Sequence, residues 1–148
     1  MSNPYQQAAK HYQTTELQDQ VNQASPHQLI DMLFAGAKKY ITTAKMCMDQ
    51  NQIEAKGIFI AKATDIVIYL QSILDMDKGG DISIRLNKLY DYIQMILLQA
   101  HLHNNIAQLD EAHRLIDEIH DGWQQIGKEV DQIDPQQVAA NDESRSSL

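Results

Sequence analysis

Apolar residues recur at helical spacing along most of the chain between residues 25 and 133. Side chains three or four positions apart share one face of a helix. The pattern is most regular in the last segment, where it forms a single seam: Leu109, Ala112, Ile116, Ile119, Trp123, Ile126, Val130 and Ile133. Such a seam is typical of a helix that packs in a bundle.

The start of the first predicted helix is marked by a capping box. Ser25 fits the N-cap, Pro26 the first helical position and Gln28 the third. We expect this helix to end near Gln50. It carries two adjacent apolar stripes: Leu29, Leu33, Gly36, Tyr40, Ala44 and Cys47, and beside them Ile30, Phe34, Ile41 and Met48. Glycine at position 36 is expected to let a neighbouring helix or a partner approach closely.

Three further helices are expected from similar signals. Asn51 is expected to cap a helix over residues 52–76, and Asp81 a helix over residues 82–102. Asn105 is expected to cap the last helix, which begins directly after it. The connections are only a few residues long, and such short connections make neighbouring long helices antiparallel.

The predicted fold is therefore all-α, an antiparallel up-down four-helix bundle over residues 25–133. Residues 1–24 are expected to form a flexible N-terminal arm. Residues 134–148 are polar, and we expect a disordered tail there.

The second and third predicted helices carry more apolar residues than one core-facing side can hold. The core arc of the second helix consists of Ile60, Ala63, Ile66, Val67, Leu70, Ile73 and Leu74. Three residues lie well outside this arc: Ile58, Ile68 and Tyr69. The core arc of the third helix consists of Ile82, Leu86, Leu89, Tyr90, Ile93, Ile96, Leu97 and Ala100. Four residues cluster on its opposite side: Ile84, Met95, Leu98 and Leu102.

This second apolar face predicts an interaction surface. No helix of a four-helix bundle is enclosed on all sides, and contiguous apolar patches on soluble proteins usually mark binding sites. One interpretation is a groove for apolar helices of a partner. The alternative is that the short tails or a homodimer contact cover these residues.

Composition and charge exclude several classes of function. The 148-residue chain has a formal net charge of −8 and a pI of about 5.0, which disfavours a nucleic-acid partner. Its single cysteine, Cys47, cannot form an internal disulfide and is expected in the core. No signal peptide is visible, and no segment has the roughly 20 uninterrupted apolar residues of a membrane span. We expect a soluble cytoplasmic protein that does not insert into the membrane.

Candidate metal and catalytic residues are few. Two pairs have the acid-x-x-His spacing of di-iron bundles: Asp110 with His113 and Asp117 with His120. They lie beside the core seam, so we expect a solvated face. His101 and His103 would point about 160° apart on a helix, which makes a poor chelate. No phosphoacceptor histidine context, phosphate loop or triad motif is apparent, so we expect no enzyme, no metal and no cofactor.

Several collinear motifs resemble the FliS family of flagellar secretion chaperones. They are ASPHQLIDMLFAGA (24–37), IEAKG (53–57), LDMDKGG (74–80), LYDY (89–92), QAHLHNN (99–105) and Trp123. The resemblance extends from about Tyr12 to Ile126. It implies a small cytoplasmic bundle that binds the C-terminal segment of flagellin and prevents its premature polymerisation. It also implies that the cargo complex is presented to the membrane protein of the export gate.

The predicted binding residues come from two sources. Tyr5 and Tyr12 are seven apart in a polar arm and would share one face of a helix. The resemblance assigns Tyr12 to the flagellin-binding region, whereas Tyr5 has no counterpart in it. The arm is expected to cover the groove or to grip cargo. The remaining residues are predicted from periodicity alone: Ile58, Ile68, Tyr69, Ile84, Met95, Leu98 and Leu102.

A second function stays open at this point. The same apolar face suits a non-enzymatic helical adaptor or regulator that self-associates or binds another apolar helix. A homodimer in the absence of cargo is compatible with either function.

Overall fold

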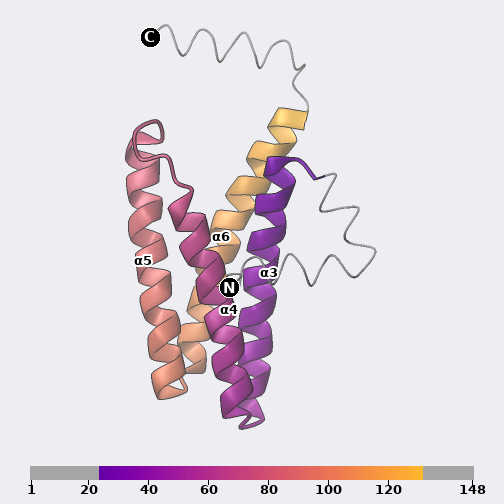
Figure 1. Cartoon of the computed structure of the whole chain (residues 1–148), viewed down its shortest axis with the longest axis vertical. Coiled ribbons are helices and arrows are strands. Elements are labelled where there is room, and N and C mark those ends of the chain that lie inside the picture. The colour runs from indigo at the N-terminus through magenta and orange to yellow at the C-terminus, as the bar shows by residue number, and fades with distance from the viewer. Residues whose placement is uncertain (1–23, 132–148) are drawn as a thin grey trace, which may run out of the picture.

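The computed structural model describes residues 24–131, which form four helices joined by short turns (Figure 1). They are α3 (Pro26–Asp49), α4 (Ile53–Ser72), α5 (Gly80–His103) and α6 (Ile106–Asp131). Successive helices run in opposite directions, and both α3 and α5 pack against α4 and α6. The predicted all-α, up-down bundle is confirmed for the described residues. None of these helices is long and apolar enough to cross a membrane.

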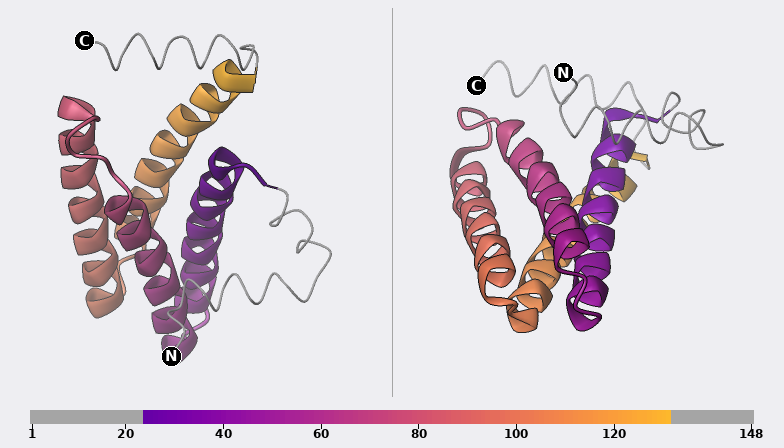
Figure 2. Two further views of the ribbon diagram at one scale, coloured as in Figure 1. Left: turned by 45° about the horizontal axis from the view of Figure 1, so that its top comes forward. Right: turned by 60° about the horizontal axis from the view of Figure 1, so that its bottom comes forward.

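The helices diverge toward one end of the bundle, as the turned views in Figure 2 show. The α3–α4 and α5–α6 turns lie together at the opposite end. At the divergent end, the α4–α5 turn lies apart from the beginning of α3 and the end of α6. Apolar residues near the divergent end therefore have fewer neighbours than their helical position alone would suggest.

Two of the predicted helix caps are confirmed. The Ser25 hydroxyl accepts the Gln28 backbone N–H at 3.2 Å, and the Gln28 side chain accepts the Ser25 N–H at 2.9 Å. At the start of α6, Asn105 Oδ1 accepts the Gln108 N–H at 3.2 Å. Each bond satisfies a backbone donor that the first turn of a helix leaves without an intrahelical partner.

Two other predicted caps are wrong. Asn51 adopts a left-handed conformation (φ 56°) that turns the chain between α3 and α4, and Gln52 precedes α4 without a side-chain cap bond. Asp81 lies inside the first turn of α5, whose N-cap is Gly79. An acidic residue is still favourable there, because it lies near the positive end of the helix dipole.

Helix α4 ends at Ser72, four residues before the predicted end at Met76. The reason is a local turn around Asp75, whose carboxylate accepts the backbone N–H groups of Asp77 and Lys78 at 3.1 and 2.9 Å. These side-chain bonds offer the backbone an alternative to continuing the helix.

The core is one cluster of buried side chains from all four helices: Phe34, Ala37, Ile41, Ala44, Met48, Ile60, Ala63, Ile66, Val67, Leu70, Tyr90, Ile93, Ile96, Leu97, Ala100, Leu109, Ala112 and Ile116. The predicted core position of Cys47 is confirmed, since its side chain is buried. Gly36 lies against Ile66 of α4, and a methyl group at Gly36 would sit 3.6 Å from Ile66 Cδ1. This is ordinary van der Waals distance, so the predicted approach of a neighbouring helix is present without being unusually tight.

Three residues predicted to lie in the core are exposed instead. Ile82 is 70% exposed, Ile126 51% and Ile73 45%. Ile82 and Ile126 fall on the predicted core arcs, but Ile82 belongs to the first turn of α5 and Ile126 to the last turns of α6. These two helix ends lie at the divergent end of the bundle (Figure 2). Ile73 lies beyond the last residue of α4.

A buried phenol makes the stability of the bundle sensitive to alkaline pH. Burial raises the pKa of Tyr90 to about 12 from an ordinary value of 10.0. Because the folded-state pKa is the higher one, the neutral phenol stabilises the fold fully below pH 10, and this stabilisation is lost as pH rises toward 12. Between these pH values we expect the free energy of unfolding to fall by about 2 kcal/mol more in the wild-type protein than in Tyr90→Phe. Urea unfolding at a series of pH values measures the difference, and parallel curves would contradict the expectation.

Candidate partner-binding surface

Helix α5 presents four exposed apolar residues on the side away from the core, three of them close together in its C-terminal half. The four residues are between 43% and 62% exposed: Ile84, Met95, Leu98 and Leu102. Leu97, the neighbour of Leu98 in the chain, is by contrast completely enclosed. The predicted exposure of the four residues is confirmed.

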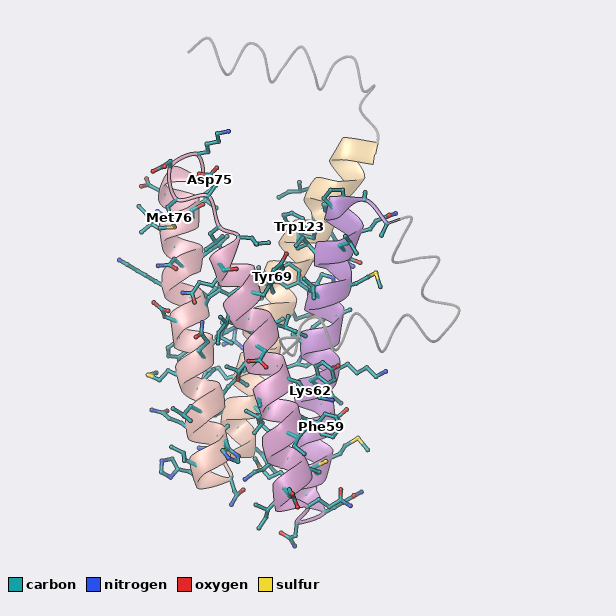
Figure 3. The ribbon with its side chains drawn as sticks, in the orientation of Figure 1. Phe59, Lys62, Tyr69, Asp75, Met76 and Trp123 are labelled. Carbon is teal, nitrogen blue, oxygen red and sulfur yellow. The ribbon has the colours of Figure 1, made fainter. Side chains whose placement is uncertain are left out.

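Helix α4 contributes two exposed apolar residues, Ile58 at 51% and Ile68 at 47%. Their predicted exposure is also confirmed. Tyr69 of α4, which was predicted with them, is only partly buried (Figure 3). We use the name α4–α5 surface for the six exposed residues of the two helices: Ile58, Ile68, Ile84, Met95, Leu98 and Leu102.

Polar contacts hold the two helices of the α4–α5 surface side by side. Gln71, one turn after Ile68, extends its amide toward α5, where Asn87 Oδ1 and Asp91 Oδ1 lie 2.9 and 2.7 Å from its nitrogen. Gln94 donates to the Gln71 amide oxygen at 2.7 Å. These bonds bring the two stripes into one surface, which periodicity within either helix could not predict.

A buried lysine joins the same two helices near the other end of α5. Lys56 is 2% exposed, and its ammonium group donates to the backbone carbonyl of His101 at 3.0 Å and to the Asn104 side chain. A positive charge is favourable at the C-terminal end of a helix. A methyl group at Gly57 would lie 3.1 Å from the His101 ring, so α4 and α5 are tightly packed here. Next to this junction, Gln52, Ile53, Glu54, Ala55 and Ile58 line a shallow open hollow.

The seam between α3 and α6 contains an aromatic stack. The His27 and Trp123 rings stack with centroids 4.6 Å apart. His27 Nε2 lies 2.8 Å from the Trp123 carbonyl oxygen, and the Trp123 indole donates to the His27 carbonyl at 3.0 Å. The rings of Phe34 and His120 are stacked with centroids 5.3 Å apart. The aromatic side chains along the α3–α6 seam are therefore engaged with each other within the bundle.

The predicted solvated position of His120 is wrong. The residue is only 5% exposed, and Nε2 lies 2.6 Å from Asp31 Oδ1 of α3. It turns inward because Asp31 supplies a polar partner and Phe34 an aromatic one. Both partners are nearly ninety positions away in the sequence, so the local pattern around His120 does not reveal them.

The carboxylates of the two acid-x-x-His pairs form ion pairs with lysines of α3. Lys38 lies 2.8 Å from Asp117 and Lys45 lies 2.9 Å from Asp110. The hydrogen bond from Lys38 lowers the pKa of Asp117, and the hydrogen bond to Asp110 raises the pKa of Lys45. In the part of the chain that the structure describes, no three histidine, cysteine or acidic side chains are grouped as a metal site requires.

Several exposed apolar residues were not predicted as surface residues. They are Met46, Ile53, Met76 and Tyr92. Ile53 and Met76 lie at or beyond the ends of α4, where the helical pattern gives no information about exposure. Tyr92 stays at the surface, where its hydroxyl donates to Glu111 of α6 at 2.7 Å. This contact joins two helices, so the pattern within α5 does not reveal it. Of the predicted site residues, Tyr5 and Tyr12 lie outside the described residues.

Comparison with known proteins agrees with the motifs in the sequence. The family model described as "Flagellar protein FliS" matches residues 8–130. The flagellar secretion chaperone FliS of Salmonella typhimurium is 40% identical over 118 residues, which cover 79% of this chain and 87% of that protein. FliS of Vibrio cholerae is 37% identical over 127 residues (86% and 93%), and FliSB of Pseudomonas aeruginosa 37% over 119 residues (80% and 94%). The chain belongs to the FliS family of flagellar secretion chaperones.

Proposed function

We propose that this protein binds the C-terminal segment of flagellin in the bacterial cytosol, prevents its premature polymerisation and delivers it to the membrane protein of the export gate. The observation that carries the proposal is the α4–α5 surface, a run of exposed apolar side chains beside a fully packed core. On a member of a secretion-chaperone family, such a surface suits an apolar segment of an export cargo.

The physical role of the α4–α5 surface follows from how filament subunits assemble. A cargo segment that forms helices in a filament has an apolar stripe, which is exposed while the subunit is unassembled. Covering that stripe with the side chains of α4 and α5 removes the surface through which subunits would associate. Ordering the segment on binding consumes part of the interaction free energy, which leaves a complex that can still release its cargo.

Tyr5 and Tyr12 are proposed to contribute from the N-terminal arm, either by covering the α4–α5 surface or by gripping the cargo. A tyrosine suits both roles, because its ring buries a large apolar area while its hydroxyl keeps a polar partner.

The proposal is tested by mixing the purified full-length chain with the C-terminal segment of flagellin. We expect a 1:1 complex by sedimentation, with more helical circular dichroism than the sum of the two components, because the segment becomes ordered on binding. A segment of the same composition in scrambled order is the control. Absence of a complex, together with a homodimer that depends on concentration, would favour the adaptor function instead.

A further inference from the structure

Two carboxylates interrupt the apolar pattern of the α4–α5 surface. On α5, Asp91 lies seven residues after Ile84 and four before Met95, so it occupies the same side of the helix as both. On α4, Asp65 lies seven residues after Ile58 and three before Ile68. Each helix therefore has an acidic side chain among its exposed apolar residues, and a lysine three positions before it: Lys62 on α4 and Lys88 on α5.

Asp65 has no ion-pair partner among the described residues. Its side chain is partly buried, and this burial raises the pKa of the carboxyl group. Among the described residues, no lysine, arginine or histidine lies within ion-pair distance of it. The ammonium group of Lys62, on the same helix, instead lies 5.5 Å from the ring centroids of Tyr40 and Phe59 (Figure 3).

Asp91 has a neutral partner that is shared with another residue. The Gln71 amide nitrogen lies 2.7 Å from Asp91 Oδ1, but it also lies 2.9 Å from Asn87 Oδ1 and 3.2 Å from the Asn87 carbonyl oxygen. An amide group has two hydrogens, so it cannot serve all three acceptors fully. Lys88, one turn earlier on α5, forms no ion pair with Asp91 in the described structure.

The carboxylates along the α3–α6 seam have lysine partners, which Asp65 and Asp91 lack. There, Asp110 and Asp117 are neutralised by Lys45 and Lys38. An apolar helix laid over the α4–α5 surface would remove water from carboxylates that have no such cation. Burying an unpaired carboxylate is unfavourable unless the partner supplies the compensating charge.

We propose that the α4–α5 surface recognises an amphipathic helix whose apolar stripe carries basic side chains opposite Asp65 and Asp91. The apolar side chains supply most of the buried area, and the two carboxylates determine the register and direction of the bound helix. A helix with an acidic residue at either position is rejected, because like charges would be brought together in a dry interface. The inference rests on the proposed function, in which this helix belongs to the flagellin segment.

The test combines charge reversal on both sides of the interface. Asp65→Lys and Asp91→Lys are prepared in the full-length chain, with Asp121→Lys on the exposed face of α6 as the matched control for net charge. The probes are the flagellin C-terminal segment and a set of copies in which each lysine or arginine is changed in turn to glutamate. We expect each α4–α5 variant to lose about 10-fold in affinity while the control binds like the wild-type chain. One glutamate copy should bind the matching lysine variant more tightly than it binds the wild-type chain.

The outcomes separate this inference from the proposed function. If the wild-type chain binds none of the probes, the proposed function fails. If it binds, and Asp65→Lys and Asp91→Lys bind every probe as the wild-type chain does, the function stands and the charge recognition is overturned. Circular dichroism of each variant verifies that the bundle is intact, so a loss of affinity cannot be attributed to unfolding.

Discussion

Replacing Leu98 and Leu102 together by aspartate is expected to weaken binding of the flagellin segment by at least about 100-fold. Both leucines are more than half exposed, at 56% and 62%, and lie one helical turn apart on α5. Burying a leucine side chain contributes roughly 1.5–3 kcal/mol, and each aspartate would add the cost of removing a charge from water. Isothermal titration calorimetry with the wild-type and variant chains measures the loss.

The same double substitution should leave the bundle folded. Substitutions of exposed side chains usually change the free energy of unfolding by no more than about 0.5 kcal/mol each. Gln124→Asp with Gln125→Asp, on the exposed face of α6, adds the same charge elsewhere and should retain binding. The α4–α5 surface is not the binding site if the leucine variant has a much lower free energy of unfolding in urea while its folded fraction still binds cargo.

Shortening Leu97, the neighbour of Leu98 in the chain, should lower the stability of the bundle, which the Leu98 and Leu102 substitutions leave unchanged. Leu97→Ala is expected to lower the free energy of unfolding by about 3 kcal/mol, because Leu97 is completely enclosed and its removal leaves a cavity between the helices. Domains of this kind are stabilised by only about 5–15 kcal/mol, so this loss is a large fraction of the total. Urea unfolding monitored by circular dichroism measures it.

Leu98→Ala is the matched control for this second prediction. It removes the same atoms from the next position of the same helix, but from a side chain that faces outward. We expect a loss below about 1 kcal/mol in stability and a clear loss in cargo affinity. Equal destabilisation by the two substitutions would mean that the outward stripe of α5 is part of the core, or is covered by other parts of the chain.

Much of the fold could be predicted because its signals are local. The capping box at Ser25 and the cap at Asn105 each involve residues within one helical turn, and both are present in the structure. The caps predicted at Asn51 and Asp81 failed for a reason that is also local. Asn51 adopts a left-handed turn and Asp75 binds backbone groups of the next turn, so the helix boundaries shift.

The candidate binding surface was predictable only in part. The outward positions of Leu98 and Leu102 follow from the periodicity of one helix, and their exposure is confirmed. The exposure of Ile82 and Ile126 does not follow from it, because periodicity assigns both to core arcs, whereas they lie near the ends of α5 and α6 where the helices diverge. The burial of His120 depends on Asp31, which belongs to another helix.

The sequence by itself determined that the chain forms helices, where most of them begin, which side of each is apolar, and which family the chain resembles. These properties depend on residues within one or two turns of each other, so the order of residues is sufficient. Only the tertiary structure decided which apolar residues find partners, that Gln71 and Lys56 bring α4 and α5 together, and that two carboxylates lie in the resulting surface without a cation. These features depend on contacts between side chains on different helices, whose distances are set by how the whole bundle packs.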